Sequence, residues 1–164
     1  MLSALETAAP ATPGAVLTLT GSTLISKVGG ASGPLYGTAF RGAGKALGDT
    51  ANVDLPGLAT ALEAALAGVQ RLGAAREGDK TMVDALAPAT GAFSKAIAEG
   101  ASDADALTAL AEAAQAGAVA TISMQALKGR ASYLGPRSVG HEDPGAASTA
   151  LILGALRDAA LAGR

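Results

Sequence analysis

The sequence of 164 residues predicts an all-α fold. Hydrophobic residues make up 49% of the chain, aromatic residues only 2%, and Ala, Leu and Val supply most of the apolar share. This composition favours closely packed helices with small side chains at their contacts. Apolar residues recur at helical spacing along most of the chain, and no segment alternates strongly between apolar and polar residues as a half-buried strand does.

Four helical segments are predicted in the first half of the chain. The predicted ranges are 2–8, 14–28, 32–47 and about 58–69. Pro10 and Pro13 interrupt the first of them, which reads as the last turns of a helix. Gly29 and Gly30 stop the second. A polar loop from Gly73 to Lys80 is expected after the fourth.

Three helices are predicted in the second half, over about 82–97, 103–122 and 145–161. Thr81 and Asp103 are expected to cap the first two of these helices, and Pro88 to kink the first. The apolar residues expected on the buried side of the middle helix are Leu107, Leu110, Ala114, Ala118 and Ile122.

The segment 128–147, KGRASYLGPRSVGHEDPGAA, contains four glycines and two prolines and is too long for a simple connector. Loops of more than about 12 to 15 residues without secondary structure are commonly functional or disordered. Tyr133, Leu134 and Val139 argue against disorder. We therefore expect an ordered loop packed over a site.

The glycine-rich segment 29–37, GGASGPLYG, is a candidate phosphate-binding turn. Glycine adopts positive φ at little steric cost, so successive N–H groups of such a run can point toward one anion. The helix that begins near Ser32 would aim its positive end at the same place. A plain glycine-rich helix connector is the alternative interpretation, because isolated glycine patterns are weakly specific.

The long loop carries three cationic side chains, on Lys128, Arg130 and Arg137. Arg130 is the first choice for a phosphate ligand, since a guanidinium can bind phosphate oxygens in bidentate geometry; a solvated loop charge is the alternative. The tripeptide Asp143-Pro144-Gly145 suits a helix start, and could also present main-chain groups to a ligand. His141, the only histidine, is either a general base or a solvated loop residue.

Charge and composition argue against several function classes. The net charge is −2 and no basic stripe is present, which argues against nucleic acid as a partner. Cysteine is absent, which excludes disulfides and thiolate metal sites. The N-terminus lacks a signal-peptide pattern and no stretch reaches about 18 uninterrupted apolar residues. We expect a soluble, cytoplasmic protein that does not enter a membrane.

Acidic residues are dispersed, so the residues themselves offer no metal site. Asp103 and Asp105 lie at an expected helix start, where capping and the helix dipole explain them. Asp79 is a better candidate for a site-facing acid, with a cap or turn role as the alternative. No Walker A, zinc or serine-hydrolase motif is present.

Three motifs together resemble one family. GGASGPLYG at 29–37, GDKTM at 78–82 and TISMQALKGRASYLGPRSVGHEDPGA at 121–146 closely resemble, in sequence and order, the nucleotide-binding L subunit of dihydroxyacetone kinase. The resemblance covers almost the whole chain. It implies a single domain over residues 1–164 with the family's fold, an antiparallel barrel of eight helices that binds ADP or ATP in the loops at one end.

The resemblance also implies a function and a set of nucleotide contacts. In the phosphotransferase-system form of the family, bound ADP is phosphorylated by a carrier M subunit and passes the phosphoryl group to dihydroxyacetone on a K subunit. Such a chain is a kinase subunit that supplies no catalytic side chain of its own. The nucleotide contacts implied by position are Ala31, Ser32, Gly73, Met82, Arg130, Asp143, Pro144 and Gly145, with Leu35, Thr81 and Leu134 as further lining residues.

The sequence departs from the family at its start. Members carry an acidic GDxDxG segment whose aspartates hold two Mg²⁺ ions on the nucleotide, and nothing of this kind precedes Gly29. We expect about six of the eight helices, no metal ligands, and weak or absent ADP binding by these 164 residues. A miscalled or cut start would account for this, and an in-frame GDxDxG upstream in the genomic DNA would show it.

Two other interpretations stay open at this stage. One is a degenerate, non-catalytic helical module that binds a partner through the apolar seam left by the missing helices. The other is a C-terminal fragment of the ATP-dependent, single-chain dihydroxyacetone kinase. The phosphoryl donor, the acceptor and the oligomeric state are left open by the sequence.

Overall fold

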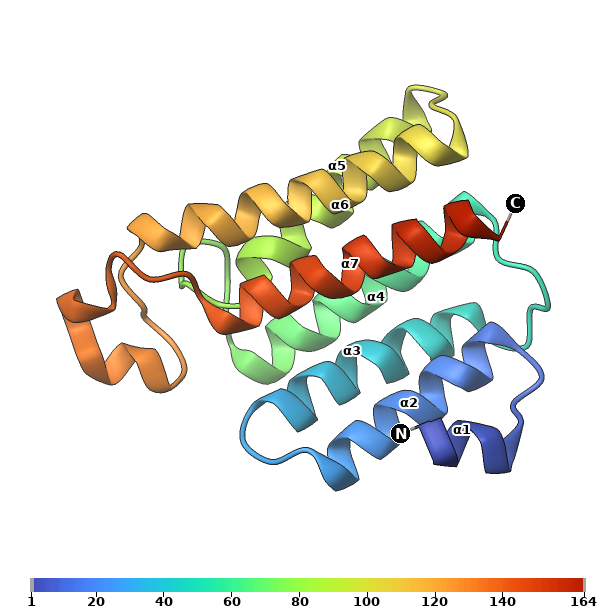
Figure 1. Ribbon diagram of the computed structural model, residues 1–164, viewed down its shortest axis with the longest axis horizontal. Helices are drawn as coiled ribbons and strands as arrows, with labels where there is room; N and C mark the ends of the chain where they lie inside the picture. Colours follow the sequence, from blue (N-terminus) through green and yellow to red (C-terminus); the bar gives the residue numbers. More distant parts are fainter. Residues whose placement is uncertain (1, 164) are drawn as a thin grey trace. The chain divides into compact units, whose positions relative to one another are not determined.

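The computed structural model describes residues 2–163, and these residues form only helices and loops (Figure 1). The all-α prediction is therefore confirmed. The chain divides into two compact units, residues 1–74 and residues 75–164. Each unit has its own helix contacts and is described separately.

The first unit contains a short helix and three long ones. They are α1 (Leu2–Ala8), α2 (Pro13–Lys27), α3 (Ser32–Leu47) and α4 (Leu55–Gly73). Helix α3 packs against both α2 and α4, and α1 packs against α2 (Figure 1). Thr12 and Asp54 cap α2 and α4, because their side chains accept hydrogen bonds from Ala15 N and Gly57 N.

Glycines let α2 and α3 approach each other closely. A Cβ atom on Gly14 would lie 2.1 Å from the carbonyl oxygen of Gly48, and one on Gly21 would lie 2.6 Å from that of Gly37. Both distances are far below van der Waals contact, and in both cases the obstacle is backbone. Small residues at these crossings are thus required by the packing of the first unit.

The second unit contains three long helices and two 3₁₀ segments. They are α5 (Val83–Ala98), α6 (Asp103–Ala120), η1 (Thr121–Ser123), η2 (Arg130–Ser138) and α7 (Pro144–Ala162). Helix α6 packs against α5 and α7, and α5 also contacts α7. Phe93, Val83 and Leu110 are fully buried in this unit, and Leu153 of α7 is almost so.

Helix positions agree closely with the predictions, but the predicted cap of α6 and the predicted burial of Ile122 are wrong. Helix α3 spans the predicted range, and α2 and α7 each begin one residue early. The cap of α6 is Ser102 rather than Asp103, because the Ser102 side chain accepts the hydrogen bond from Asp105 N. Ile122 is 39% exposed, not buried. Ile122 lies in η1, and a 3₁₀-helix turns by about 120° per residue, more than an α-helix does. The side chain of Ile122 therefore no longer lies in line with the buried residues of α6.

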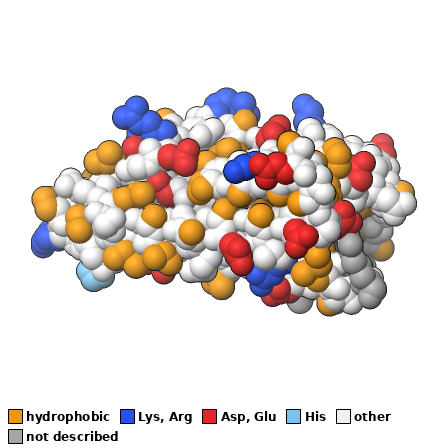
Figure 2. Space-filling model, turned by 90° about the horizontal axis from the view of Figure 1, so that it is seen from above, with side chains coloured by type: hydrophobic (Ala, Val, Ile, Leu, Met, Phe, Trp, Pro, Cys, Tyr) orange, Lys and Arg blue, Asp and Glu red, His pale blue; other side chains and the backbone are white. Residues whose placement is uncertain are grey.

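Two surface features bear on the function classes. On the face shown in Figure 2, Lys and Arg side chains form separate groups rather than a continuous stripe. One helix within residues 2–163, α7, meets the length and hydropathy expected of a membrane span, with a mean hydropathy of 1.2. It packs against α6 and α5, and its Arg157 forms a 2.7 Å ion pair with Asp158.

Candidate functional site

The glycine turn 29–37 joins α2 to α3 in the first unit, and its four glycines have different structural roles. Gly30 alone among them has a positive φ, of 70°. Gly33 and Gly37 lie inside α3, where they pack tightly against the backbone or side chains of the preceding segment. The turn is therefore shaped by one left-handed residue and two close contacts, not by a run of left-handed glycines.

The N-terminus of α3 has no side-chain cap. Its N-cap residue is Ala31, which makes no capping hydrogen bond. Helices α2, α4, α6 and α7 carry side-chain caps, from Thr12, Asp54, Ser102 and Asp143, whereas α5, like α3, has none. The first N–H groups of a helix lack intrahelical partners. The start of α3 at Ala31 and Ser32 can therefore donate hydrogen bonds to an anion.

Gly33→Ala is predicted to destabilise the protein by about 1–3 kcal/mol, as overpacking of a filled site does. A Cβ atom at Gly33 would lie 2.0 Å from the carbonyl oxygen of Val28, so the turn must move. Gly29→Ala is the matched control, because nothing lies within 4 Å of a Cβ there. Urea denaturation followed by circular dichroism measures both. Equal losses of stability in the two variants would contradict the conclusion that the close contact with Val28 requires a glycine at position 33.

Gly73, the third predicted contact in the first unit, is the last residue of α4. Ala74 follows it with a left-handed φ of 45° and ends the helix. Gly73 thus lies at a helix C-terminus, whereas Ala31 and Ser32 lie at a helix N-terminus.

In the second unit, the structure brings Met82 together with the start of α7. Gly145 lies against Met82, because a Cβ atom at Gly145 would be 3.3 Å from Met82 N. Asp143 caps α7 by accepting a 2.7 Å hydrogen bond from Ala146 N, and Pro144 is the first helical residue. The Asp143 N–H donates to the hydroxyl of Thr121 at 2.9 Å. The side chain of Met82 is buried, at 6% exposure.

The turn before α5 is held by a buried carboxylate that the sequence interpretation missed. Asp84 accepts hydrogen bonds from Gly78 N at 2.6 Å and Thr81 N at 2.7 Å. The Thr81 hydroxyl accepts a hydrogen bond from Val83 N. The predicted cap at Thr81 is nevertheless wrong, because the N-cap residue of α5 is Met82, which makes no side-chain capping hydrogen bond. Asp79 is also buried and accepts from Arg76 N, so its role is that of a turn residue.

A second missed residue, Lys80, links this turn to the long loop. It is 3% exposed, and its Nζ donates to the carbonyl oxygens of Met124 and Ser138. The available signal was its place in GDKTM, one of the three motifs, but nothing local in the sequence indicates that a lysine is buried. Its partners are 44 and 58 residues away.

The segment predicted as an ordered loop is ordered, but for a different reason from the expected one. Residues 130–138 form η2, and α7 begins at Pro144, before the predicted end of the loop. Tyr133 is 88% exposed, Leu134 46% and Val139 45%. Burial of these apolar side chains therefore does not order the segment, and polar contacts such as that between Ala126 N and the Ser138 hydroxyl, 2.9 Å, do so instead.

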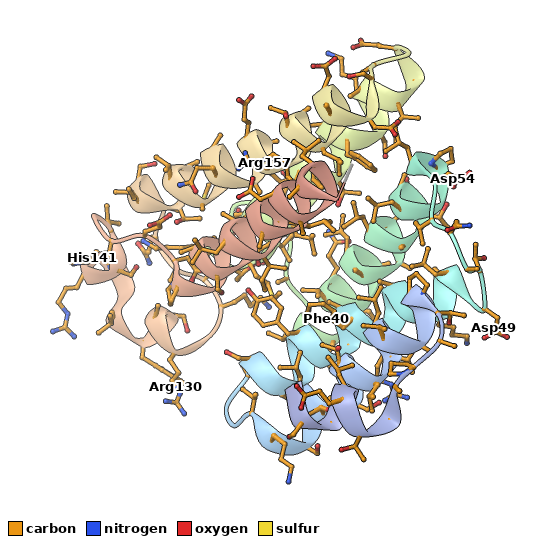
Figure 3. All side chains as sticks on the ribbon, turned by 45° about the vertical axis from the view of Figure 1, so that its right-hand side comes forward. Phe40, Asp49, Asp54, Arg130, His141 and Arg157 are labelled. Carbon is orange, nitrogen blue, oxygen red and sulfur yellow. The ribbon has the colours of Figure 1, made fainter. Side chains whose placement is uncertain are left out.

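Arg130 and His141 are both exposed. Arg130 opens η2, directly after Gly129, whose φ is 67°. Its side chain points away from α5, α6 and α7 of its own unit (Figure 3) and makes no hydrogen bond or ion pair with any residue in the described range 2–163. Its guanidinium is therefore accessible to a ligand. Nothing in the surroundings of His141 indicates a role as a base.

Burial raises the pKa of the Asp143 carboxyl above its ordinary value of 3.8, and the charge of Asp84 adds to the rise. Hydrogen bonds from Ala146 N and Gly145 N and the charge of Lys80 act in the opposite direction. The native state therefore binds more protons than the unfolded state between pH 3.8 and the native pKa. Consequently this carboxyl makes the protein less stable as the pH rises through that window.

Asp143→Asn is predicted to remove this pH dependence while keeping the cap, because Asn caps helices about as well as Asp. Relative to the wild type, the variant should gain stability as the pH rises from 3.5 to 7. Urea denaturation across this range measures the difference. Asp54→Asn, at the exposed cap of α4, is the matched control. The quantity to compare is the difference in free energy of unfolding between each variant and the wild type. The prediction would be refuted if this difference fell with rising pH for Asp143→Asn, or if it changed with pH in the same way for both variants.

Neither of two further features of a possible site, a surface hollow and a metal-binding cluster, involves the predicted nucleotide contacts. A shallow hollow of about 840 Å³ in the first unit is lined by α2, α3 and α4 and includes Arg41, Lys45 and Arg71. None of the sequence-predicted contacts lines it. Within the described part of the chain, no group of three or more His, Asp or Glu side chains is arranged to hold a metal ion.

These features define an all-α protein with small-residue helix contacts and polar turns at helix starts. The chain belongs to the DAK2 domain family, whose model matches residues 1–158. The match extends over both units. Family membership, expected from three motifs, is thereby confirmed.

Relatives agree with this assignment. The chain is 44% identical over 136 residues to the ADP-binding subunit DhaL of PEP-dependent dihydroxyacetone kinase 1 from Listeria innocua, which covers 83% of this chain and 63% of the relative. It is 44% identical over 140 residues to DhaL of Escherichia coli, covering 85% and 67%. The chain thus spans about two thirds of the length of these relatives.

A solved structure is also similar. The dihydroxyacetone kinase of C. freundii in complex with AMP-PNP and Mg²⁺ matches with a TM-score of 0.61 and 33% sequence identity, over 90% of this chain and 23% of that one. The likeness supports an all-α fold of the DhaL type. It also shows that chains with this fold occur within longer kinases.

Proposed function

We propose that this chain is the ADP-binding part of a dihydroxyacetone kinase and takes part in phosphoryl transfer to dihydroxyacetone. The observation that carries the proposal is the family match over 1–158, combined with an uncapped helix start in the first of its three motifs. The whole of residues 1–164 would act as one DhaL-type domain in the cytoplasm. Its partners would be a dihydroxyacetone-binding K subunit and a phosphoryl-carrier M subunit.

Each of the two units, taken by itself, carries groups that can bind nucleotide phosphate. The start of α3 offers N–H donors at Ala31 and Ser32, and Gly30 supplies the left-handed backbone that a tight anion-binding turn needs. Arg130 offers an accessible guanidinium, which binds phosphate oxygens in bidentate geometry. When bound, ADP would supply the phosphate that accepts and gives up the phosphoryl group. The protein's own groups bind and orient it.

The remaining proposed contacts are main-chain and apolar groups. Gly73 lies at the end of α4, while Met82, Asp143, Pro144 and Gly145 lie where α5 and α7 begin. Met82 and Asp143 are both buried, so we propose that they shape the turn that contacts the nucleotide. The resemblance implies Mg²⁺ for the family, and within the described residues no group of three or more His, Asp or Glu side chains is arranged to hold a metal ion. No step is therefore assigned to the metal.

The test is an NMR titration of this chain with ADP, in the presence and absence of Mg²⁺. We expect weak binding, with a dissociation constant of about 1 mM or higher, and little effect of Mg²⁺.

Arg130→Ala should weaken ADP binding about tenfold or more, the equivalent of losing a charge-assisted hydrogen bond. Arg137→Ala, also exposed on η2, is the matched control. Micromolar binding would contradict the expected lack of a metal site, and equal effects of both variants would refute the role of Arg130.

A second candidate function is favoured by the surface of α7. The neighbouring residues Leu151 and Ile152 are 73% and 39% exposed on this helix, and a large contiguous apolar surface marks a partner-binding site. A non-catalytic module that binds a protein partner would use such a surface. Purification with a stable protein partner but no bound ADP would favour this function over the first.

A further inference from the structure

The backbone conformation of Lys80 and the burial of its side chain are both energetically unfavourable. It has a left-handed φ of 60°, which is uncommon for a residue other than Gly, Asn or Asp. Its side chain is also almost completely buried, and a buried ammonium group is unfavourable without hydrogen-bond partners. Both costs must be offset by the interactions that the side chain makes.

Those interactions join the two ends of one segment. Lys80 Nζ donates to Met124 O at 3.0 Å and to Ser138 O at 2.5 Å. Met124 precedes the segment 125–137 and Ser138 follows it. One buried cation thus holds both ends of the segment against the turn that precedes α5.

The same ends are joined by further polar contacts. Leu127 N donates to Asp79 O at 3.0 Å, and Ser138 Oγ accepts from Ala126 N. Ser138 Oγ also donates to Gly135 O at 2.6 Å. Since Tyr133 and Leu134 are exposed, this polar stem, and not a hydrophobic core, determines the conformation of the segment that carries Arg130.

We propose that Lys80 is the positioning residue for Arg130, an inference that rests on the proposed function. The ammonium group fixes the ends of the segment 125–137, and the segment in turn presents the Arg130 guanidinium to nucleotide phosphate. Lys80 does not itself bind phosphate, because its ammonium is buried and is bound to two carbonyl oxygens. It acts through the backbone of the segment.

The surrounding carboxylates fit this role. Asp84 and Lys80 both act electrostatically on Asp143, so each of them lies near this carboxyl. Asp84 and Asp143 are hydrogen-bonded to backbone N–H groups at the starts of α5 and α7. Lys80 is thus the cation of a buried polar cluster that connects two helix starts to the segment 125–137.

The test uses amide hydrogen exchange on the full chain without nucleotide, in which Lys80→Met is compared with Lys95→Met on the exposed face of α5. The reporters are the hydrogen-bonded amides of Ala126, Leu127 and Gly140, the last of which donates to Ile122 O at 2.7 Å. We expect exchange at these three amides to rise at least tenfold in Lys80→Met only, with little change in α6. Unchanged exchange at these amides would overturn the proposal, and so would an equal rise throughout the second unit.

A chemical rescue keeps the proposal testable if Lys80→Met folds poorly. The natural chain has no cysteine, so the single thiol of Lys80→Cys can be alkylated with 2-bromoethylamine in denaturant, which restores an ammonium group at nearly the same length. Refolded alkylated protein should regain the wild-type exchange at the three amides, whereas iodoacetamide-treated protein should not. Equal exchange in the two products would overturn the proposal.

ADP titration of the same samples separates this inference from the proposed function. We expect ADP affinity to fall about tenfold in Lys80→Cys and to return after alkylation with 2-bromoethylamine. If wild-type protein shows no ADP binding, the proposed function fails, while the exchange data still decide whether Lys80 orders the segment. If exchange responds but ADP affinity does not, the link from Lys80 to Arg130 is wrong.

Discussion

Asp84→Ala is expected to lower the free energy of unfolding by about 3–5 kcal/mol, because it removes two hydrogen bonds to a charged acceptor that are worth about 1.5–3 kcal/mol each. The carboxylate accepts from Gly78 N and Thr81 N and is 4% exposed. Both donors would lose their partner, and Gly78 would no longer be held in its left-handed conformation, φ 90°. Urea denaturation at neutral pH measures the loss.

The control for Asp84→Ala is Glu112→Ala, an acidic side chain exposed on α6 of the same unit. Its effect should stay within about 0.5 kcal/mol, as for most surface substitutions. Asp84→Asn should fall between the two, because the amide retains one acceptor oxygen for one of the two N–H groups. If Asp84→Ala proved as stable as the control, Asp84 would not organise the turn before α5.

Phe93→Ala is expected to cost about 3–5 kcal/mol, as large-to-small substitutions of buried aromatic residues do. Phe93 is completely buried on α5, in a chain with few aromatic side chains. The buried apolar residues of the second unit are mostly Ala and Leu, which are too small to fill the cavity that an aromatic ring leaves. Thermal and urea unfolding, followed by circular dichroism, check the prediction.

Leu151→Ala is the matched control for Phe93→Ala, since Leu151 is 73% exposed on α7. It should change the free energy of unfolding by less than about 0.5 kcal/mol. A small loss in Phe93→Ala would mean that the second unit does not depend on this core. A large loss in Leu151→Ala would instead mean that the exposed face of α7 is covered in solution.

The positions of the helices could be predicted from the sequence because their signals are local. Apolar spacing and the stop signal at Gly29 and Gly30 located α2 and α3 to within a residue, and Asp143 and Pro144 correctly marked the start of α7. The errors arose where local signals compete. At α6, Ser102 and Asp103 are both good caps, and the backbone geometry selected Ser102.

Less of the candidate site could be predicted. The motifs identified the turns that contain Ala31, Met82 and Arg130, but not how each turn is held. The glycines of the first motif were expected to bend the backbone toward an anion, whereas Gly33 is instead required by a close contact with Val28. The assignment of these residues to nucleotide binding stays a prediction for the titrations above.

By itself, the sequence determined the all-α class, the order of the helices and the membership of the DAK2 domain family. Helical periodicity and capping depend on residues three or four positions apart, so they can be read along the chain. Only the tertiary structure decided that Lys80 is buried against Met124 and Ser138, that Met82 touches Gly145, and that Tyr133 is exposed. The contacts of Lys80 and Met82 join residues tens of positions apart, and the exposure of Tyr133 depends on what packs around it. Only the packing of the folded chain determines both.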